Sequence, residues 1–213
     1  MKRAVLWDFG GVILTSPFEA FRRYEVGHGL PRDFIRSVNT TNAHANAWAL
    51  LERSQITVDE FDELFAIESN SLGHRVPGAD VLSLVAGDVR PEMVAMLDRV
   101  KEAGYRVACL TNNVVGGDGA FGVSPRETRA MEIAGIMDRF DVIVESSKVG
   151  VRKPEPRFYE IACELLHVSP LECVFLDDLG INLKPAAAMG MTTIKVTTPE
   201  QAISDLGSAL GWT

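Results

Sequence analysis

The sequence contains few cysteines and no long apolar run. Its 213 residues include three cysteines, and an odd count without a CxxC pair argues against a disulfide framework. No apolar stretch approaches the roughly 20 residues that cross a bilayer, so we expect no membrane partner. The opening residues, MKRAVLWDFGG, reach an acidic residue before any apolar segment of signal-peptide length, which favours a cytoplasmic protein.

Positive charge is also scarce. The chain has 21 Lys and Arg against 29 Asp and Glu, a formal net charge of −8. Nucleic acid repels such a protein unless a basic patch exists, and because no Lys or Arg run exceeds a pair, we predict no nucleic-acid partner. The four histidines lack metal-ligand spacing. With 46% hydrophobic and 23% charged residues, the composition is that of a globular domain and excludes a disordered or collagen-like chain.

Short apolar segments alternate with amphipathic patterns along most of the chain. The apolar segments predict strands at Arg3–Trp7, Tyr105–Leu110, Val142–Val144, Cys173–Leu176 and Thr192–Val196. The patterns between and after them predict helices at Pro91–Ala103, Pro156–Leu166, Ile181–Met189 and Pro199–Leu210. This alternation predicts an α/β fold with a doubly wound, parallel, Rossmann-like sheet that is covered on both faces. Ligands of such sheets bind beyond the carboxyl ends of the strands.

Residues 16–87 interrupt the alternation with consecutive helical patterns and no clear strand. Thr57 and Glu60 have the spacing of a capping box, so a helix is expected to begin there. We therefore predict a core of residues 1–15 and 88–213, with a small α-helical cap (16–87) inserted after the first strand. The segment Gly117–Gly122 matches G-x-G-x-x-G, but it does not join a strand directly to a helix, so we interpret it as a loop at the site entrance.

Polar residues follow three of the predicted strands, at Asp8, Thr111 and Asp177-Asp178. A carboxylate at a strand end can act as a nucleophile, and a second acid beside it needs a cation between them. Mg²⁺ suits this position because it prefers oxygen ligands. A lysine such as Lys153 can neutralise anionic oxygens, and a threonine hydroxyl can hold a phosphoryl oxygen. Together these residues form a phosphate clamp that contains a nucleophile.

At these positions the sequence resembles the haloacid dehalogenase-like superfamily, whose members are mostly Mg²⁺-dependent phosphatases. The four motifs read Asp8-Phe9-Gly10-Gly11-Val12, Leu110-Thr111-Asn112-Asn113, Arg152-Lys153-Pro154-Glu155-Pro156 and Leu176-Asp177-Asp178. The resemblance covers nearly the whole chain and includes a helical cap after the first motif. The cap segment Trp48–Arg53 is most similar to the branch related to the N-terminal phosphatase domain of soluble epoxide hydrolases.

The resemblance implies a Mg²⁺-dependent phosphatase that hydrolyses a small organic phosphate monoester through an aspartyl phosphate on Asp8. It further implies that Asn182 supports the metal site. The implied catalytic residues are Asp8, Thr111 and Lys153. The implied substrate-binding residues are Gly11, Asn112 and Asn113. The implied Mg²⁺ ligands are Asp8, the Gly10 carbonyl, Asp177 and Asp178.

One departure from the family pattern leaves alternatives open. The usual phosphatase of the family has a second aspartate where this chain has Gly10, and general acid–base help is typically worth roughly 10²–10⁴ in rate. The alternatives are a metal-independent 2-haloacid dehalogenase that uses Asp8, a catalytically impaired ligand-binding relative, and a phosphotransferase. The pair Asp177-Asp178 favours metal chemistry, because the dehalogenase branch replaces these acids.

Two local assignments also have rivals. Lys148 is an alternative to Lys153, which is favoured by the proline that follows it. In the cap, a polar patch beside Trp48 is either a substrate contact or a solvated helix surface; it comprises Asn39, Asn42, His44 and Asn46. The expected partner is a small phosphorylated molecule, and the expected assembly is a monomer or a homodimer.

Overall fold

A parallel sheet forms the centre of the molecule. The computed structural model describes residues 1–113 and 127–212. Its strands are β1 (Ala4–Trp7), β2 (Arg106–Thr111), β3 (Val142–Glu145), β4 (Cys173–Asp177) and β5 (Thr192–Lys195). They lie in the order β3-β2-β1-β4-β5, and every neighbouring pair is parallel. The five predicted strands are therefore confirmed, with small shifts at their ends.

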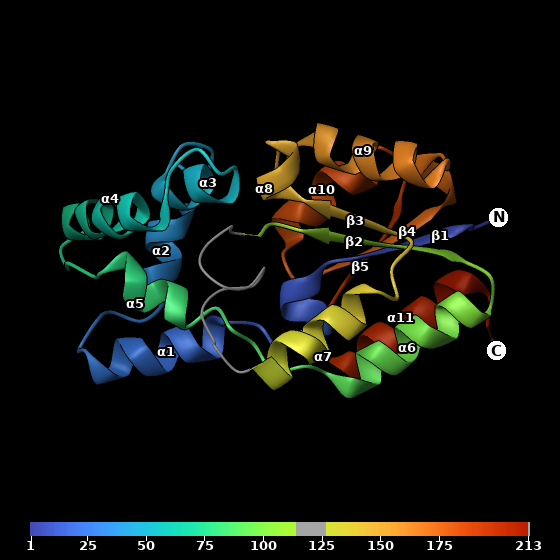
Figure 1. The fold of residues 1–213 in the computed structure, drawn as a ribbon, viewed down its shortest axis with the longest axis horizontal. Helices are drawn as coiled ribbons and strands as arrows, with labels where there is room; N and C mark the ends of the chain where they lie inside the picture. The colour runs from blue at the N-terminus through green and yellow to red at the C-terminus, as the bar shows by residue number, and fades with distance from the viewer. Residues whose placement is uncertain (114–126, 213) are drawn as a thin grey trace.

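Helices cover both faces of this sheet (Figure 1). One face packs against α6 (Pro91–Glu102), α7 (Glu127–Met137) and α11 (Pro199–Leu210). The other packs against α9 (Pro156–Leu166) and α10 (Gly180–Ala188), while the short α8 (Ser146–Val149) follows β3. Side chains of one strand alternate between the faces, so that Trp7 joins the first core and Leu6 the second. The doubly wound α/β fold is confirmed.

Local signals explain where several helices begin and end. Pro91 occupies the first turn of α6, where its missing N–H costs nothing. Gly104 follows α6 with a φ of +84°, a conformation that glycine adopts without strain. The side chain of Thr57 accepts from Glu60 N, and the Glu60 carboxylate accepts from Thr57 N, which is the predicted capping box.

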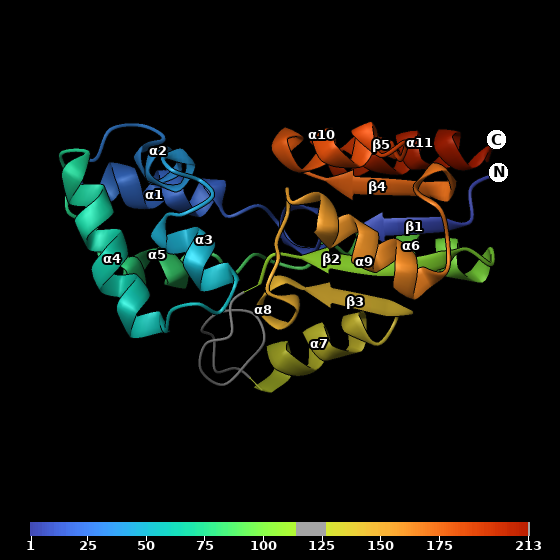
Figure 2. The same cartoon turned by 90° about the horizontal axis from the view of Figure 1, so that it is seen from above.

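Five helices form a cap beside the core. They are α1 (Phe18–Gly27), α2 (Phe34–Thr40), α3 (Ala47–Glu52), α4 (Val58–Ser71) and α5 (Gly78–Ser83). They share an apolar core of their own, which includes Phe21, Ile35 and Phe61. Figure 2 shows the strand arrows pointing toward this cap. The helical insertion after the first strand is therefore confirmed, and its exact limits at residues 16 and 87 stay predictions.

The chain enters and leaves the cap through two paired segments. Leu14 and Val89 form an antiparallel bridge, and Thr15 N donates to Asp88 O at 2.8 Å. The loop predicted at Gly117–Gly122 lies outside the described residues. Among the residues that the structure describes, no helix combines the length and apolar character needed to cross a membrane.

Candidate active site

Asp8 follows β1, and its side chain caps a tight turn, Phe9–Ile13. The turn requires glycine at position 11, where φ is +78° and an added Cβ would lie 2.3 Å from Cγ of Asp178. Gly11 thus allows the turn to contact Asp178 closely. Arg90 Nη1 donates to the Gly11 carbonyl at 2.9 Å and holds the turn in place. Gly10 is different, because its φ is −69° and an added Cβ would have no neighbour within 4 Å.

Lys153 joins two of the predicted acids. Its side chain is 1% exposed, and its Nζ lies 2.7 Å from Asp8 Oδ1 and 2.8 Å from Asp177 Oδ2. Burial by itself lowers the pKa of Lys153, but the charges of Asp177 and Asp8 outweigh it and leave the pKa raised. The ammonium is therefore held in its charged form. Lys148, by contrast, is 70% exposed and pairs with Glu145.

Asp177 is the last residue of β4, the strand next to β1, and Asp178 follows it. Oδ1 of Asp177 accepts from Leu179 N at 2.8 Å, and Asn182 Nδ2 lies 3.0 Å from both carboxylate oxygens. These bonds fix the orientation of Asp177. The role of Asn182 in supporting a metal site stays a prediction. Asp178 accepts from Ser16 Oγ at 3.2 Å, so the first residue of the predicted cap also contacts the acidic group.

The three aspartates form an oxygen-rich group that fits Mg²⁺. Carboxylate oxygens of Asp8, Asp177 and Asp178 lie within 4.8 Å of one another. Burial, opposed by Lys153, raises the pKa of Asp8 well above its usual value. Burial and then the charge of Asp177 raise the pKa of Asp178 to about 6. When the three aspartates and Lys153 are all ionised, their net charge is −2. A divalent cation that prefers oxygen ligands, such as Mg²⁺, would balance this charge.

The second motif lies where β2 ends, beside β1. Thr111 is buried there. Asn112 turns its side chain to the main chain of Lys153: Oδ1 accepts from Lys153 N at 2.9 Å, and Nδ2 donates to Lys153 O at 3.0 Å. Asn113 Nδ2 donates to Glu145 at 2.9 Å. Both side-chain amides therefore bind the protein, and the Asn113 N–H also donates to Ser146 Oγ at 3.0 Å. A substrate-binding role of Gly11, Asn112 and Asn113 stays a prediction.

The polar patch predicted in the cap divides into separate environments. Asn46 is buried and caps α3, since its side chain accepts from Ala49 N at 2.9 Å. His44 is exposed. Asn46 therefore has a structural role, and a substrate contact of the other patch residues stays a prediction.

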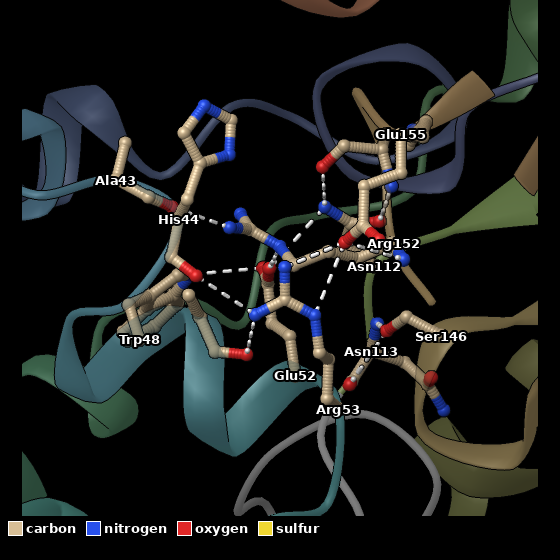
Figure 3. Close-up of polar contacts among 12 residues, drawn as sticks. Ala43, His44, Trp48, Glu52, Arg53, Asn112, Asn113, Ser146, Arg152 and Glu155 are labelled. Carbon is tan, nitrogen blue, oxygen red and sulfur yellow. Dashed lines mark hydrogen bonds and ion pairs between the residues drawn. The ribbon is translucent and has the colours of Figure 1, made fainter. Parts of the chain in front are cut away.

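Several contacts near the site were not expected from the sequence. They join the cap to the segment around Lys153 and come from Glu52 and Arg53, at the end of α3 (Figure 3). Glu52 forms an ion pair with Arg152, and Arg53 forms one with Glu155 at 2.6 Å. Each pair joins residues about 100 positions apart, so sequence spacing carried no signal for them.

Known proteins similar to this chain were found by sequence. The family described as haloacid dehalogenase-like hydrolase matches residues 2–190. Acyl-CoA dehydrogenase family member 10 of Mus musculus is 33% identical over 217 residues, with 99% of this chain and 19% of that protein covered. Bifunctional epoxide hydrolase 2 of Mus musculus is 32% identical over 220 residues, with 98% and 39% covered. The chain thus spans less than half of either protein. A sesquiterpene phosphatase of Aspergillus oryzae is 25% identical, with 98% and 97% covered.

Solved structures share the fold. A HAD family enzyme of Bacteroides thetaiotaomicron, in complex with magnesium and inorganic phosphate, has a TM-score of 0.58 at 20% identity, with 92% of this chain and 94% of that chain covered. An L-2-haloacid dehalogenase of Xanthobacter autotrophicus, with chloropropionic acid covalently bound, has a TM-score of 0.60 at 20% identity, with 98% and 83% covered. At this level of identity the likeness supports the architecture alone.

Proposed function

The chain belongs to the haloacid dehalogenase-like hydrolase family, and we propose that it is a Mg²⁺-dependent phosphatase of small organic phosphate monoesters. The observation that carries this proposal is the group of three carboxylates, two of which are buried and paired with the Lys153 ammonium. This group combines a nucleophile, a fixed positive charge and a cation site at the carboxyl edge of the sheet. The sesquiterpene phosphatase of similar length is a further support, since its name assigns it phosphate chemistry.

In the first step, the Asp8 carboxylate attacks the phosphorus of the monoester. A bond forms between the carboxylate oxygen and phosphorus, the bond from phosphorus to the ester oxygen breaks, and the electron pair leaves with that oxygen. In this proposal, the Lys153 ammonium neutralises the transferring phosphoryl oxygens and the Thr111 hydroxyl holds them. The product of this step is an aspartyl phosphate on Asp8 and a free alcohol.

In the second step, water attacks the phosphorus of the aspartyl phosphate. The bond between phosphorus and the Asp8 oxygen breaks, which restores the carboxylate and releases inorganic phosphate. Lys153 remains paired with Asp8 and favours its return to the ionised form.

Asp8, the Gly10 carbonyl, Asp177 and Asp178 are the residues that would hold Mg²⁺. The bound ion supplies electrostatic stabilisation of the negative charge that the carboxylates and the phosphoryl group bring together. Asn182 and the Leu179 N–H keep Asp177 oriented for this role. Ser16 does the same for Asp178.

Gly10 shapes the expected substrate. No side chain at this position protonates the leaving oxygen, so the proton comes from water or from the substrate. A monoester with a stable leaving group, such as a sugar 1-phosphate or an aryl phosphate, depends least on that proton. We therefore propose such substrates in preference to simple alkyl phosphates.

A 2-haloacid dehalogenase is the second candidate. The observation in its favour is the same Gly10, because a departing halide needs no proton. Against it stand Asp177 and Asp178, which form an acidic cluster that a metal-independent displacement does not need.

One experiment separates the two candidates. Phosphate release from sugar 1-phosphates and an aryl phosphate is measured with Mg²⁺ and with EDTA, and chloride release from 2-chloropropionate is measured in parallel. Release of phosphate that requires Mg²⁺ and is abolished by Asp8→Asn supports the phosphatase. Chloride release in EDTA with no phosphate release refutes it.

The remaining expectations about the whole protein stay proposals. They are a small phosphorylated partner, no nucleic-acid or membrane partner, a monomeric or homodimeric state, and a cytoplasmic location.

A further inference from the structure

The segment that carries Lys153 is attached to the cap on both sides. Arg152, just before the lysine, forms an ion pair with Glu52 and donates to the Ala43 carbonyl at 2.8 Å. Glu155, just after it, accepts from Arg53 Nη2 at 2.6 Å. Figure 3 shows Glu52 and Arg53 reaching from α3 toward these two core residues. The catalytic lysine of the proposed mechanism thus lies between two ties to the cap.

Glu52 has the more buried of the two cap side chains, with 7% exposed. Its Oε1 accepts from Trp48 Nε1 at 2.9 Å. Its Oε2 faces both Arg152 Nε and Asn112 Nδ2, the latter at 3.2 Å. A buried carboxylate needs such partners on both oxygens, because an unpaired buried charge is strongly unfavourable.

Asn112 transmits the position of Glu52 to Lys153. Its amide binds the Lys153 main chain through both N–H and C=O, at 2.9 Å and 3.0 Å. These two bonds already decide which end of the amide faces which main-chain group. Glu52 Oε2 accepts a further bond from Nδ2 at 3.2 Å. Without this acceptor, the amide and the Lys153 main chain that it holds lose their tie to α3. Glu52, Asn112 and Lys153 therefore form one chain of contacts from the cap to the Asp8 carboxylate.

We propose that Glu52 is a positioning residue: through Asn112 it holds the main chain of Lys153 so that the ammonium bridges Asp8 and Asp177. The cap is then part of the catalytic arrangement and not only a cover. The proposal rests on the proposed function in one respect, namely that Lys153 neutralises phosphoryl oxygens. Its geometry is independent of the substrate.

Arg53 provides a matched control. It is the next residue in the chain, is 13% exposed, and also pairs with the lysine segment. Within the described part of the chain, its hydrogen bonds go to Glu155, His44 O and Ala49 O, and none goes to Asn112. Loss of the Arg53 tie weakens the attachment of the cap but leaves the Asn112 amide in place.

The experiment compares Glu52→Leu, Glu52→Gln and Arg53→Leu with the wild type. We expect Glu52→Leu to lower kcat for an aryl phosphate by between about tenfold and a hundredfold, the range produced by small misplacement of a catalytic group. Inorganic phosphate should bind more weakly to it in the presence of Mg²⁺, whereas affinity for Mg²⁺ alone should not change. Glu52→Gln should recover part of the loss, because its amide oxygen can face Asn112 and Arg152. Arg53→Leu should keep the wild-type kcat.

Equal kcat values for Glu52→Leu and Arg53→Leu would overturn the proposal, as would a parallel loss of Mg²⁺ affinity. If Glu52→Leu does not fold, Glu52→Gln against Arg53→Leu decides the question by the same comparison. A ligand-free readout separates this proposal from the phosphatase assignment. By NMR, side-chain amide protons of Asn112 should exchange slowly in the wild type and Arg53→Leu, and faster in Glu52→Leu. If these exchange rates are found but the wild type releases no phosphate, the positioning role is retained and the phosphatase assignment is refuted. Equal exchange rates in all three proteins would refute the positioning role.

Discussion

The open space beside Gly10 allows the missing carboxylate to be restored. Gly10 has φ −69° and ψ 132°, which any residue adopts, and an added Cβ would meet no heavy atom within 4 Å. The substitution Gly10→Asp therefore strains neither the backbone nor the surroundings of the added Cβ. Removing a glycine at such a position stabilises a protein by about 0.4–1 kcal/mol through the unfolded chain. Repulsion from Asp8 opposes this gain, so we expect little net change in stability.

The expected gain in rate depends on the leaving group. General acid catalysis is worth about 10²–10⁴, or about 3–5 kcal/mol of activation free energy. An alkyl phosphate releases a strongly basic alkoxide and should gain an amount in this range. An aryl phosphate releases a weakly basic phenolate, so its gain should be under about tenfold. The difference between the two substrates, more than either rate alone, reports the new acid.

The assay is kcat/KM for one alkyl and one aryl phosphate at saturating Mg²⁺, in the wild type, Gly10→Asp and Gly10→Asn. The asparagine variant has the same shape without an ionisable proton and should stay close to the wild type. Gly10→Asp should also gain a basic limb in its pH–rate profile, where the new acid loses its proton. Similar gains for both substrates, or a gain in Gly10→Asn, would refute the reasoning.

Three further predictions concern the acidic site. Gly11→Ala should abolish Mg²⁺ binding in calorimetry, because its Cβ would lie 2.3 Å from Cγ of Asp178 at a φ of +78°, whereas Gly10→Ala should bind Mg²⁺ normally. Lys153→Gln should lower kcat by more than a hundredfold in the phosphate-release assay, about the loss expected for one charge-stabilising group, and the exposed Lys148→Gln should not. The pKa of Asp178 is raised from 3.8 to about 6, first by burial and then by the charge of Asp177. The folded protein therefore binds more protons than the unfolded chain between these values, and stability in EDTA should fall as pH rises from about 4 to about 6. The free energy of unfolding, measured with urea at each pH, should fall less steeply with pH in Asp178→Asn and in the wild type with Mg²⁺.

Much of the fold follows from local sequence signals. The apolar segment Cys173–Leu176 predicts a strand because both of its faces are buried, and the structure extends it by one residue to Asp177. The capping box of Thr57 and Glu60 marks the start of α4. These signals work because they depend on residues within a few positions of one another. Helix α8 (Ser146–Val149) was not predicted, since four residues are too few for a periodic pattern.

The centre of the site could also be predicted, for a topological reason. Parallel strands present their carboxyl ends at one edge, so the residue that follows β1 and the last residue of β4 must meet there. Asp8 and Asp177 do so, and Lys153 lies between them. The side chains of Asn112 and Asn113 could not be placed in this way. Their direction depends on hydrogen bonds to Lys153 and Glu145, which the sequence pattern does not specify.

The contacts between cap and core depend on how two separately packed units meet. Glu52 is a helix-end residue in the cap core, and Arg152 belongs to the loop before α9, so neither has a local reason to be charged and buried. A buried ion pair is rarely the most stable solution at such a place, because apolar residues of similar size avoid the desolvation cost. What the pair adds is a fixed position, because Glu52 accepts from Trp48 on one carboxylate oxygen and from the Asn112 amide on the other. The charges at this boundary are therefore best explained by the need to place Lys153, which requires direction as well as stability.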